Sequence, residues 1–304
     1  MKRSLRKGNG FVASMVNNWQ MYAMLFPFMF FFFLFTVWPV IASFFVSFTE
    51  YNVLEAPTWV GFENFRRLFV EDDLFMKALG NTLVFAVFTG PVGYMISFFT
   101  SWIINEFGQL TKAVLTFIFY IPSISGTVYT IWGLIFDSDI YGYANSFLIQ
   151  LGIIDDPINW FTNESYIMPL IIIVQLWMSM GTGFLAMRAG FATNDQQYYE
   201  AGAIDGIKNR WQELWHITIP MMAPHLTTAA VLQVVAMFSN SAVADTLAGN
   251  PSTNYAAHML MSHFSDYSGI RLERGYASAI AVFLFAFIFL INRVIMKALR
   301  KVGE

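Results

Sequence analysis

The sequence predicts an all-α integral membrane protein with six transmembrane helices. Of its 304 residues, 57% are hydrophobic and only 12% are charged, and the mean hydropathy is +0.53. Charged residues make up about 25% of an ordinary soluble domain, so this chain has too few to cover a water-facing surface. The second observation is a set of six runs that are almost free of charge. Together these observations exclude a soluble globular protein.

The length of each run defines a predicted span. A helix rises about 1.5 Å per residue and the hydrocarbon layer is roughly 30 Å thick, so a span needs about 20 residues nearly free of charge. All six runs are apolar on every side, so each is expected to face lipid or other helices. The runs are 21–48, 78–105, 113–136, 165–187, 217–244 and 275–292.

The first run follows a basic segment, 1–10, which contains Lys2, Arg3, Arg6 and Lys7. A signal peptide has an apolar core of about 7–15 residues followed by a small-residue cleavage site. The run 21–48 is longer than that, and no such site follows it. We therefore expect an uncleaved first span.

The distribution of Lys and Arg predicts the orientation, because these residues accumulate in cytoplasmic loops. With the N-terminus inside, 12 of the 17 Lys and Arg residues face the cytoplasm and 5 face out. Both termini are therefore expected to be cytoplasmic. The outer loops are acidic, as at Glu71-Asp72-Asp73, and either keep the exterior soluble or form a docking surface for an external partner.

Several other classes of function are excluded or disfavoured. A net charge of −3 provides no basic stripe for nucleic acid, and the absence of Cys excludes disulfides, thiolate catalysis and Cys-based zinc sites. Ser123 and Ser125 lack the G-x-S-x-G context and a nearby His that a hydrolase needs. His258 and His263 with Asp266 lack metal-ligand spacing, so they are expected to be outer-loop residues without a metal.

The longest inner connection lies between the fourth and fifth runs. Asn194-Asp195 supplies a helix N-cap, 196–204 is expected to be helical, and Gly206 is suited to the left-handed conformation that ends a helix, with Asp205 starting the next turn. A second helix is expected over 209–216, and Pro220 marks entry into the next span. Two interpretations remain open at this point: insertion into a groove on another protein, or an amphipathic anchor lying on lipid headgroups.

At these residues the chain resembles the permease subunits of binding-protein-dependent ABC importers. Their EAA motif runs Glu-Ala-Ala, three residues, Gly, then at a distance Ile-x-Leu-Pro. The matching segments here are Glu200-Ala201-Gly202, Asp205-Gly206 and Ile217-Thr218-Ile219-Pro220. Gly202 and Ile219 depart from the motif, and Gly202 is expected to loosen the first helix by about 1 kcal/mol relative to Ala.

The resemblance is closest to the carbohydrate, or maltose-type, branch. It continues at the segments Val60-Gly61-Phe62-Glu63-Asn64-Phe65, Asn81-Thr82, Trp132, Phe136, Tyr141-Gly142, Asn145, Leu151-Gly152, Asn159-Trp160, Trp177, Gly181, Ala189-Gly190, Tyr199-Glu200 and Gly275-Tyr276-Ala277-Ser278-Ala279. The resemblance implies a type I importer permease fold in the bacterial plasma (inner) membrane. It also implies a permease domain at 78–292, after an N-terminal region at 1–77 and before a basic tail at 293–304.

The resemblance implies three partners besides the bilayer: a second homologous permease, a dimer of ATP-binding-cassette ATPases, and an external solute-binding protein. The loop 191–220 would then couple to the ATPase through Glu200, Ala201, Gly202, Asp205, Gly206 and Pro220. The chain has no G-x-x-x-x-G-K-[ST] phosphate loop, so ATP is expected on the partner and no catalytic or cofactor site on this chain.

Polar residues inside spans are costly unless they face a cavity or another helix. Those expected to line the solute path are Gln175, Trp177, Gln233, Ser239, Asn240 and Ser241, and hydrogen bonding between helices explains them equally well. We therefore expect half of a sugar or oligosaccharide pathway. The alternative is an ATP-independent channel or secondary transporter, although the spans lack the charges that would bind coupling ions.

Overall fold

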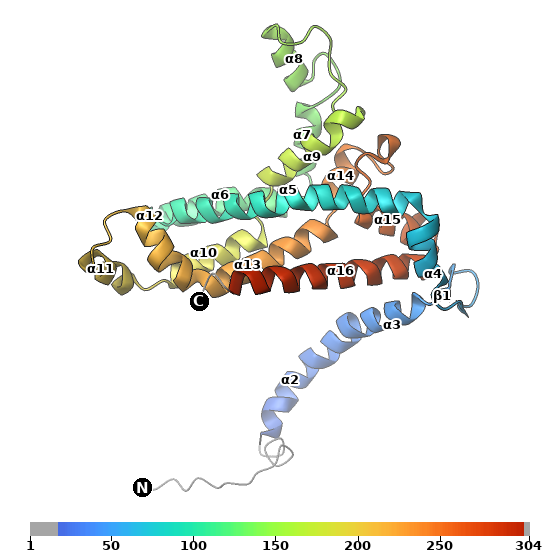
Figure 1. Ribbon diagram of the computed structural model, residues 1–304, viewed down its shortest axis with the longest axis horizontal. Coiled ribbons are helices and arrows are strands. Elements are labelled where there is room, and N and C mark those ends of the chain that lie inside the picture. Colours follow the sequence, from blue (N-terminus) through green and yellow to red (C-terminus); the bar gives the residue numbers. More distant parts are fainter. Residues whose placement is uncertain (1–17, 301–304) are drawn as a thin grey trace.

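The computed structural model describes residues 18–300, except for the side chains of 299 and 300. The predicted basic segment 1–10 and residues 301–304 of the basic tail lie outside these residues. Long helices run lengthwise between two ends (Figure 1). We call the end that carries α11 and α12 (Gln196–Ile204 and Arg210–Glu213) the loop end. We call the end that carries β1 and β2 (Thr49–Glu50 and Thr58–Trp59) the hairpin end.

The first helix diverges from the rest of the molecule (Figure 1). It consists of α2 (Trp19–Phe32), a π-helical turn (Phe33–Val37) and α3 (Trp38–Val46). None of these segments contains a buried residue. The first helix contacts the bundle where α3 packs against α16 (Arg274–Arg300). A helix this apolar must be covered by lipid or by another chain.

At the hairpin end, β1 and β2 pair antiparallel with Thr49 opposite Trp59. The short helix α4 (Glu63–Arg66) and a π-helical turn (Arg67–Glu71) follow. The Asn64 amide is buried and donates to the carbonyl oxygens of Ser47 and Thr49, both at 2.9 Å. A Cβ at Gly275 would lie 2.0 Å from the Thr49 oxygen, so only glycine lets α16 begin against this hairpin.

The bundle contains α5 (Asp73–Ile104), α9 and α10 (Glu164–Trp177 and Thr182–Thr193), α13 (Ile219–Ser239) and α16. Helix α13 is central, since it contacts α5, α10 and α16. The larger core cluster includes Phe75, Phe85, Ile171, Met259 and Ile280. The smaller cluster is made of Phe98, Met187, Phe191, Leu214, Met222 and Ala229.

Within residues 18–300, five helices are long and apolar enough to cross a membrane, and there are six candidates if one bent pair is counted as a span. The bent pair is α6 (Gln109–Ile124) and α7 (Val128–Ile135), which meet at 80°. The prediction of one continuous helix over 113–136 is therefore wrong. Pro122 lacks an amide donor and Ser125 adopts an extended conformation, which together end the helix before Gly126. A short helix, α8 (Tyr143–Gln150), follows in the connection to α9.

A buried polar cluster ties the helix ends together at the hairpin end. Asp72 caps α5, with its Oδ1 accepting from the Phe75 amide at 3.0 Å. Its Oδ2 accepts from the Tyr276 hydroxyl at 2.6 Å and contacts His263 Nε2 at 3.0 Å. His263 Nδ1 lies 3.1 Å from His258 Nε2. Burial opposes ionisation of Asp72, but the hydrogen bonds from His263, Tyr276 and the Phe75 amide hold its pKa well below the usual range.

The two histidines were expected as outer-loop residues, yet they are 4% and 1% exposed. His258 and His263 meet because the chain bends between a 3₁₀ turn (Thr253–Tyr255) and α15 (Leu260–Ser265). Asp266 is not part of this cluster and pairs with Arg271 at 2.7 Å. Burial, together with electrostatic repulsion from the neighbouring His263, lowers the pKa of His258 to about 4.

We expect thermal stability to fall as pH is lowered from 7 to 4.5. An unfolded histidine titrates near pH 6.5, whereas folded His258 titrates at about 4, so the unfolded state binds more protons between these values. The loss is on the order of 2 kcal/mol. Asp72 adds to the loss below about pH 5, where the unfolded carboxylate begins to bind protons.

Melting curves of the detergent-purified chain, followed by tryptophan fluorescence, measure this slope. His258→Gln should flatten it between pH 6.5 and 4.5, since the amide keeps a polar group at the Nε2 position. His216→Gln, at an exposed histidine of the loop end, should leave the slope intact. An unaltered slope in His258→Gln would contradict this account.

Candidate functional site

The loop end is built around α11, which covers the predicted range 196–204. Asp195 caps it, with its Oδ1 accepting from the Gln197 amide at 3.0 Å. The helix ends at Asp205, and Gly206 has a φ of +97°. The predicted N-cap and the predicted left-handed glycine are both confirmed.

The second helix of the loop begins with α12, and Asn209 caps it by accepting from the Gln212 amide at 2.9 Å. Asp205, which was expected to start the next turn, is the C-cap of α11. Helix α12 continues through a π-helical turn (Leu214–Thr218) into α13. Pro220 stands in the first turn of α13, as expected for the entry into this helix, and its missing amide donor is tolerated at that position.

Gly202 has a packing role that the sequence did not reveal. It is buried, and a Cβ there would lie 2.6 Å from Cδ1 of Ile217 and 3.1 Å from Cδ1 of Ile207. The motif departure at this position therefore lets α11 lie close against the start of α13. The Tyr199 hydroxyl strengthens this contact through Thr218 Oγ1 at 3.0 Å. The two helices of the loop consequently form one braced unit.

The outer surface of this unit is apolar at its tip. Ile204 is 86% exposed and Trp215 is 62% exposed, while Glu200, Ala201 and Asp205 are also exposed. Trp211 is turned back toward the bundle, with its ring centroid 5.4 Å from that of Trp102. The loop thus presents protruding side chains on a rigid base, which suits insertion into a groove of another protein.

A second group of polar residues surrounds the interruption between α9 and α10. A Cβ at Gly93 on α5 would lie 2.9 Å from both Gln233 Nε2 and Ser179 Cβ, so α5 and α13 meet the interruption here. Ser97 Oγ donates to the Ser179 carbonyl oxygen at 3.1 Å. Gln233 Nε2 and Ser179 Oγ are buried and have no hydrogen-bond partner among the residues that the structure describes. Two donors free to bind something else are therefore close together inside the bundle.

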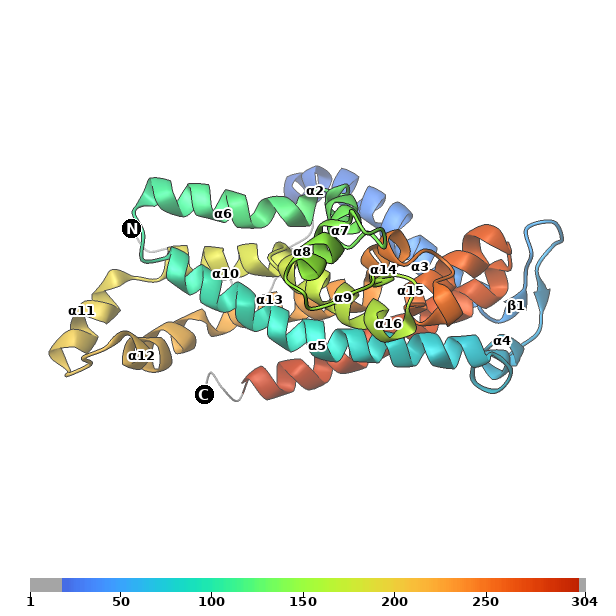
Figure 2. The ribbon, with the colours of Figure 1, turned by 90° about the horizontal axis from the view of Figure 1, so that it is seen from above.

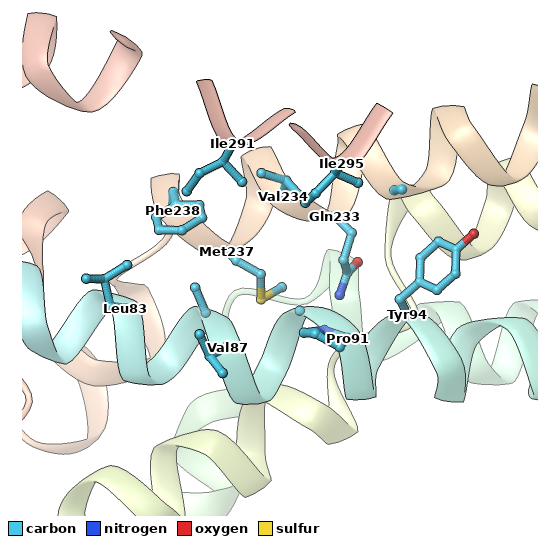
Figure 3. Close-up of a pocket in the computed structure, with 13 residues that line it drawn as sticks. Leu83, Val87, Pro91, Tyr94, Gln233, Val234, Met237, Phe238, Ile291 and Ile295 are labelled. Carbon is cyan, nitrogen blue, oxygen red and sulfur yellow. The ribbon is translucent and has the colours of Figure 1, made fainter. Parts of the chain in front are cut away.

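Gln233 also lines a cavity of about 400 Å³ between α5, α13 and α16 (Figure 3). Most of the wall is apolar, including Val87, Met237 and Ile291, and Figure 3 shows the Gln233 side chain beside Pro91. An amide in an otherwise apolar wall is a costly arrangement unless it serves a ligand or a moving helix. Gln233 therefore lies both in the wall of the cavity and beside the interruption between α9 and α10.

The other predicted path residues are spread along the bundle. Gln175 on α9 is buried with its Oε1 unpartnered, and Trp177 packs edge-to-face on Trp132 with centroids 5.4 Å apart. Ser239 is exposed at the end of α13. Asn240 follows as the C-cap of that helix, and its Oδ1 accepts from the Ala242 amide at 2.9 Å. Ser241 donates to Asp245 at 2.6 Å.

Sequence reasoning missed Ser179 and Gly93. The pair Gly181 and Gly183, close to the end of α9, was a signal of an interruption in the fourth run. Among residues 18–298, no group of three His, Asp or Glu side chains is placed to hold a metal ion.

Comparison with known proteins gives a consistent result. Residues 10–301 match the family described as binding-protein-dependent transport system inner membrane components. The probable ABC transporter permease protein YesP of Bacillus subtilis is 30% identical, with 97% of this chain and 92% of that protein covered. The arabinooligosaccharide permease AraP of the same organism is 29% identical, with 89% and 85% covered.

The fold is also known from crystal structures. A chain of a bacterial ABC transporter involved in import of the acidic polysaccharide alginate superposes with a TM-score of 0.76 at 22% identity, covering 96% of this chain and 98% of that one. A second structure of an alginate transporter, in complex with an alginate-bound periplasmic protein, gives a TM-score of 0.78 at 21% identity. The chain belongs to the family of binding-protein-dependent transport system inner membrane components, the permease subunits of ABC importers.

Proposed function

We propose that this chain forms half of the translocation pathway of an ATP-driven importer for a sugar or oligosaccharide. The observation that carries the proposal is the braced loop of α11, Gly206 and α12, with an exposed tip on a rigid base. Such a unit transmits a movement of a bound protein to α13 without a change in the unit's own conformation. The names of the relatives, which include arabinooligosaccharide and lactose permeases, support a carbohydrate as the solute.

The topology we propose has six spans with both termini in the cytoplasm of a bacterial cell, in its plasma membrane. The bent pair α6 and α7 is the third span in this arrangement. The permease domain is 78–292, preceded by the first span and outer loop at 1–77 and followed by the basic tail at 293–304. The positive charge near the loop end supports this orientation.

Three partners follow from this proposal. A second homologous permease would complete the pathway, and the unburied first helix offers it a surface. A dimer of ATP-binding-cassette ATPases would bind the ATP and receive the loop 191–220, with Glu200, Ala201, Gly202, Asp205, Gly206 and Pro220 in the coupling element. A solute-binding protein would dock at the hairpin end.

For the solute path we propose the interruption between α9 and α10. Gln233 and Ser179 have unpartnered donors and acceptors that suit sugar hydroxyls, and Gln175 and Trp177 are on the helix that leads to the interruption. Ser239 and Asn240 lie about 10 Å further along α13 from Gln233, as estimated from the rise of a helix. They would contact the solute at a different depth.

Gly206→Val is expected to reduce solute uptake and solute-stimulated ATP hydrolysis at least tenfold. A β-branched residue strains a backbone at φ +97°, so the turn between the two helices would be displaced. The assay uses the complex reconstituted in proteoliposomes. Gly108→Ala is the control, because Gly108 lies in the other turn at the loop end with a φ of −67° and open space at its Cβ. Normal coupling in Gly206→Val would contradict the role of the loop.

Gln233→Leu is expected to raise the KM for uptake several-fold while leaving membrane insertion and basal ATP hydrolysis unchanged. Leucine has a similar volume but cannot hydrogen-bond a sugar hydroxyl. Uptake measured over a range of solute concentrations tests this. Val235→Ala on the exposed side of α13 provides the matched control. An unchanged KM would remove Gln233 from the path, and flux without any ATPase would favour a channel or secondary transporter.

A further inference from the structure

A pair of cations occupies the groove between α6 and α10 near the loop end. The two helices lie beside each other there (Figure 2), and Arg188 Nε on α10 donates to Thr116 Oγ1 on α6 at 3.2 Å. Two adjoining pockets of about 570 and 560 Å³ open along this groove. Both are lined by Gln109, Lys112 and Arg188, so the cations stand where the pockets join.

Neither cation has a carboxylate partner in the described part of the chain. Arg188 Nη1 donates to the Ser101 carbonyl oxygen at 3.0 Å, and Lys112 Nζ donates to Asn105 Oδ1 at 3.2 Å. The carboxylates that line the second pocket, Glu106 and Glu213, are both paired with Arg210. Two positive charges held only by neutral groups leave the groove able to bind an anion.

The two pockets are lined by different kinds of side chain, and this difference indicates the shape of the anion. The first runs along Ala113, Phe117 and Tyr120 of α6, and Phe117 is 63% exposed. The second is lined by Asn105, Asn194 and Gln196 at the loop end. A ligand that fits both has an anionic group at the junction, an apolar tail on one side and a polar group on the other.

Depth along the helices agrees with this shape. Lys112 lies in the first turn of α6, which begins at Gln109, and Arg188 lies five residues before the end of α10 at Thr193. Cations within one or two turns of a span end reach the lipid headgroups, and each is worth about 1 kcal/mol toward an anionic lipid. The groove therefore has its charge at headgroup level and its apolar wall at acyl-chain level.

We propose that this groove, lined by Lys112 and Arg188, binds the phosphodiester headgroup of an anionic phospholipid. One acyl chain would lie along Phe117 and Tyr120. Such a lipid would fill the space between α6 and α10 and fix α6 relative to the helix that leads into the loop. The site is independent of the solute, although its assignment to the cytoplasmic leaflet rests on the topology proposed above.

Native mass spectrometry of the full chain in detergent, titrated with phosphatidylglycerol, tests the proposal. We expect one phosphatidylglycerol to bind in preference to phosphatidylcholine of the same acyl chains. Lys112→Gln and Arg188→Gln should each weaken this binding roughly fivefold, the effect of removing one cation near the surface. Arg188→Lys should retain most of the affinity. Lys297→Gln, at an exposed lysine near the C-terminal end of α16, should leave the affinity for phosphatidylglycerol unchanged.

Competition separates the lipid from a soluble anion. Inorganic phosphate or glucuronate at millimolar concentration should not displace the phosphatidylglycerol, because neither has an acyl chain to occupy the wall of Phe117. Displacement by either would overturn the lipid assignment and indicate a site for a soluble anion. Equal affinity for phosphatidylcholine, or full affinity in Lys112→Gln, would also overturn it. Since the readout is lipid binding, failure here and failure of the transport assays are distinguishable.

Discussion

In the hydrocarbon layer every backbone donor and acceptor must find its partner inside the protein, and this constraint shapes the whole bundle. An interrupted helix leaves such groups free, and at two of the breaks other segments of the chain supply partners for them. The break between α9 and α10 is packed against α5, where Ser97 donates to the Ser179 carbonyl oxygen. At the end of α13, Asn240 supplies the acceptor for the Ala242 amide. The polar chemistry of the bundle is thus concentrated at its breaks.

Three asparagine side chains perform the same task for loops. Asn64 binds two carbonyl oxygens next to β1, and Asn81 donates to the carbonyl oxygens of Tyr255 and His258 at 2.9 and 3.0 Å. Asn145 is fully buried and donates to three carbonyl oxygens while accepting from the Trp160 indole at 2.9 Å. Each amide thereby joins separate segments of the chain through backbone carbonyl oxygens.

The sequence was informative wherever local chemistry decides the structure. Run length and hydropathy located the long apolar helices, and Asp195 and Gly206 marked the ends of α11, because capping and left-handed turns depend on the residue itself. It was misleading where a contact between distant segments decides. Gly202 is required by its close contact with Ile217, and His258 meets His263, which in turn contacts Asp72, through a bend in the chain. Ser179 gained its place in the candidate site only because α5 and α13 converge on it.

The bundle has a further property that follows from its detached first helix. The core clusters draw on residues from Leu68 onward and none from α2 or α3. Apolar substitutions along α2 therefore leave the packed core untouched and change only the surface that this helix presents to lipid or to another chain. The length of this apolar segment can consequently match the thickness of the bilayer without any repacking of the remaining helices.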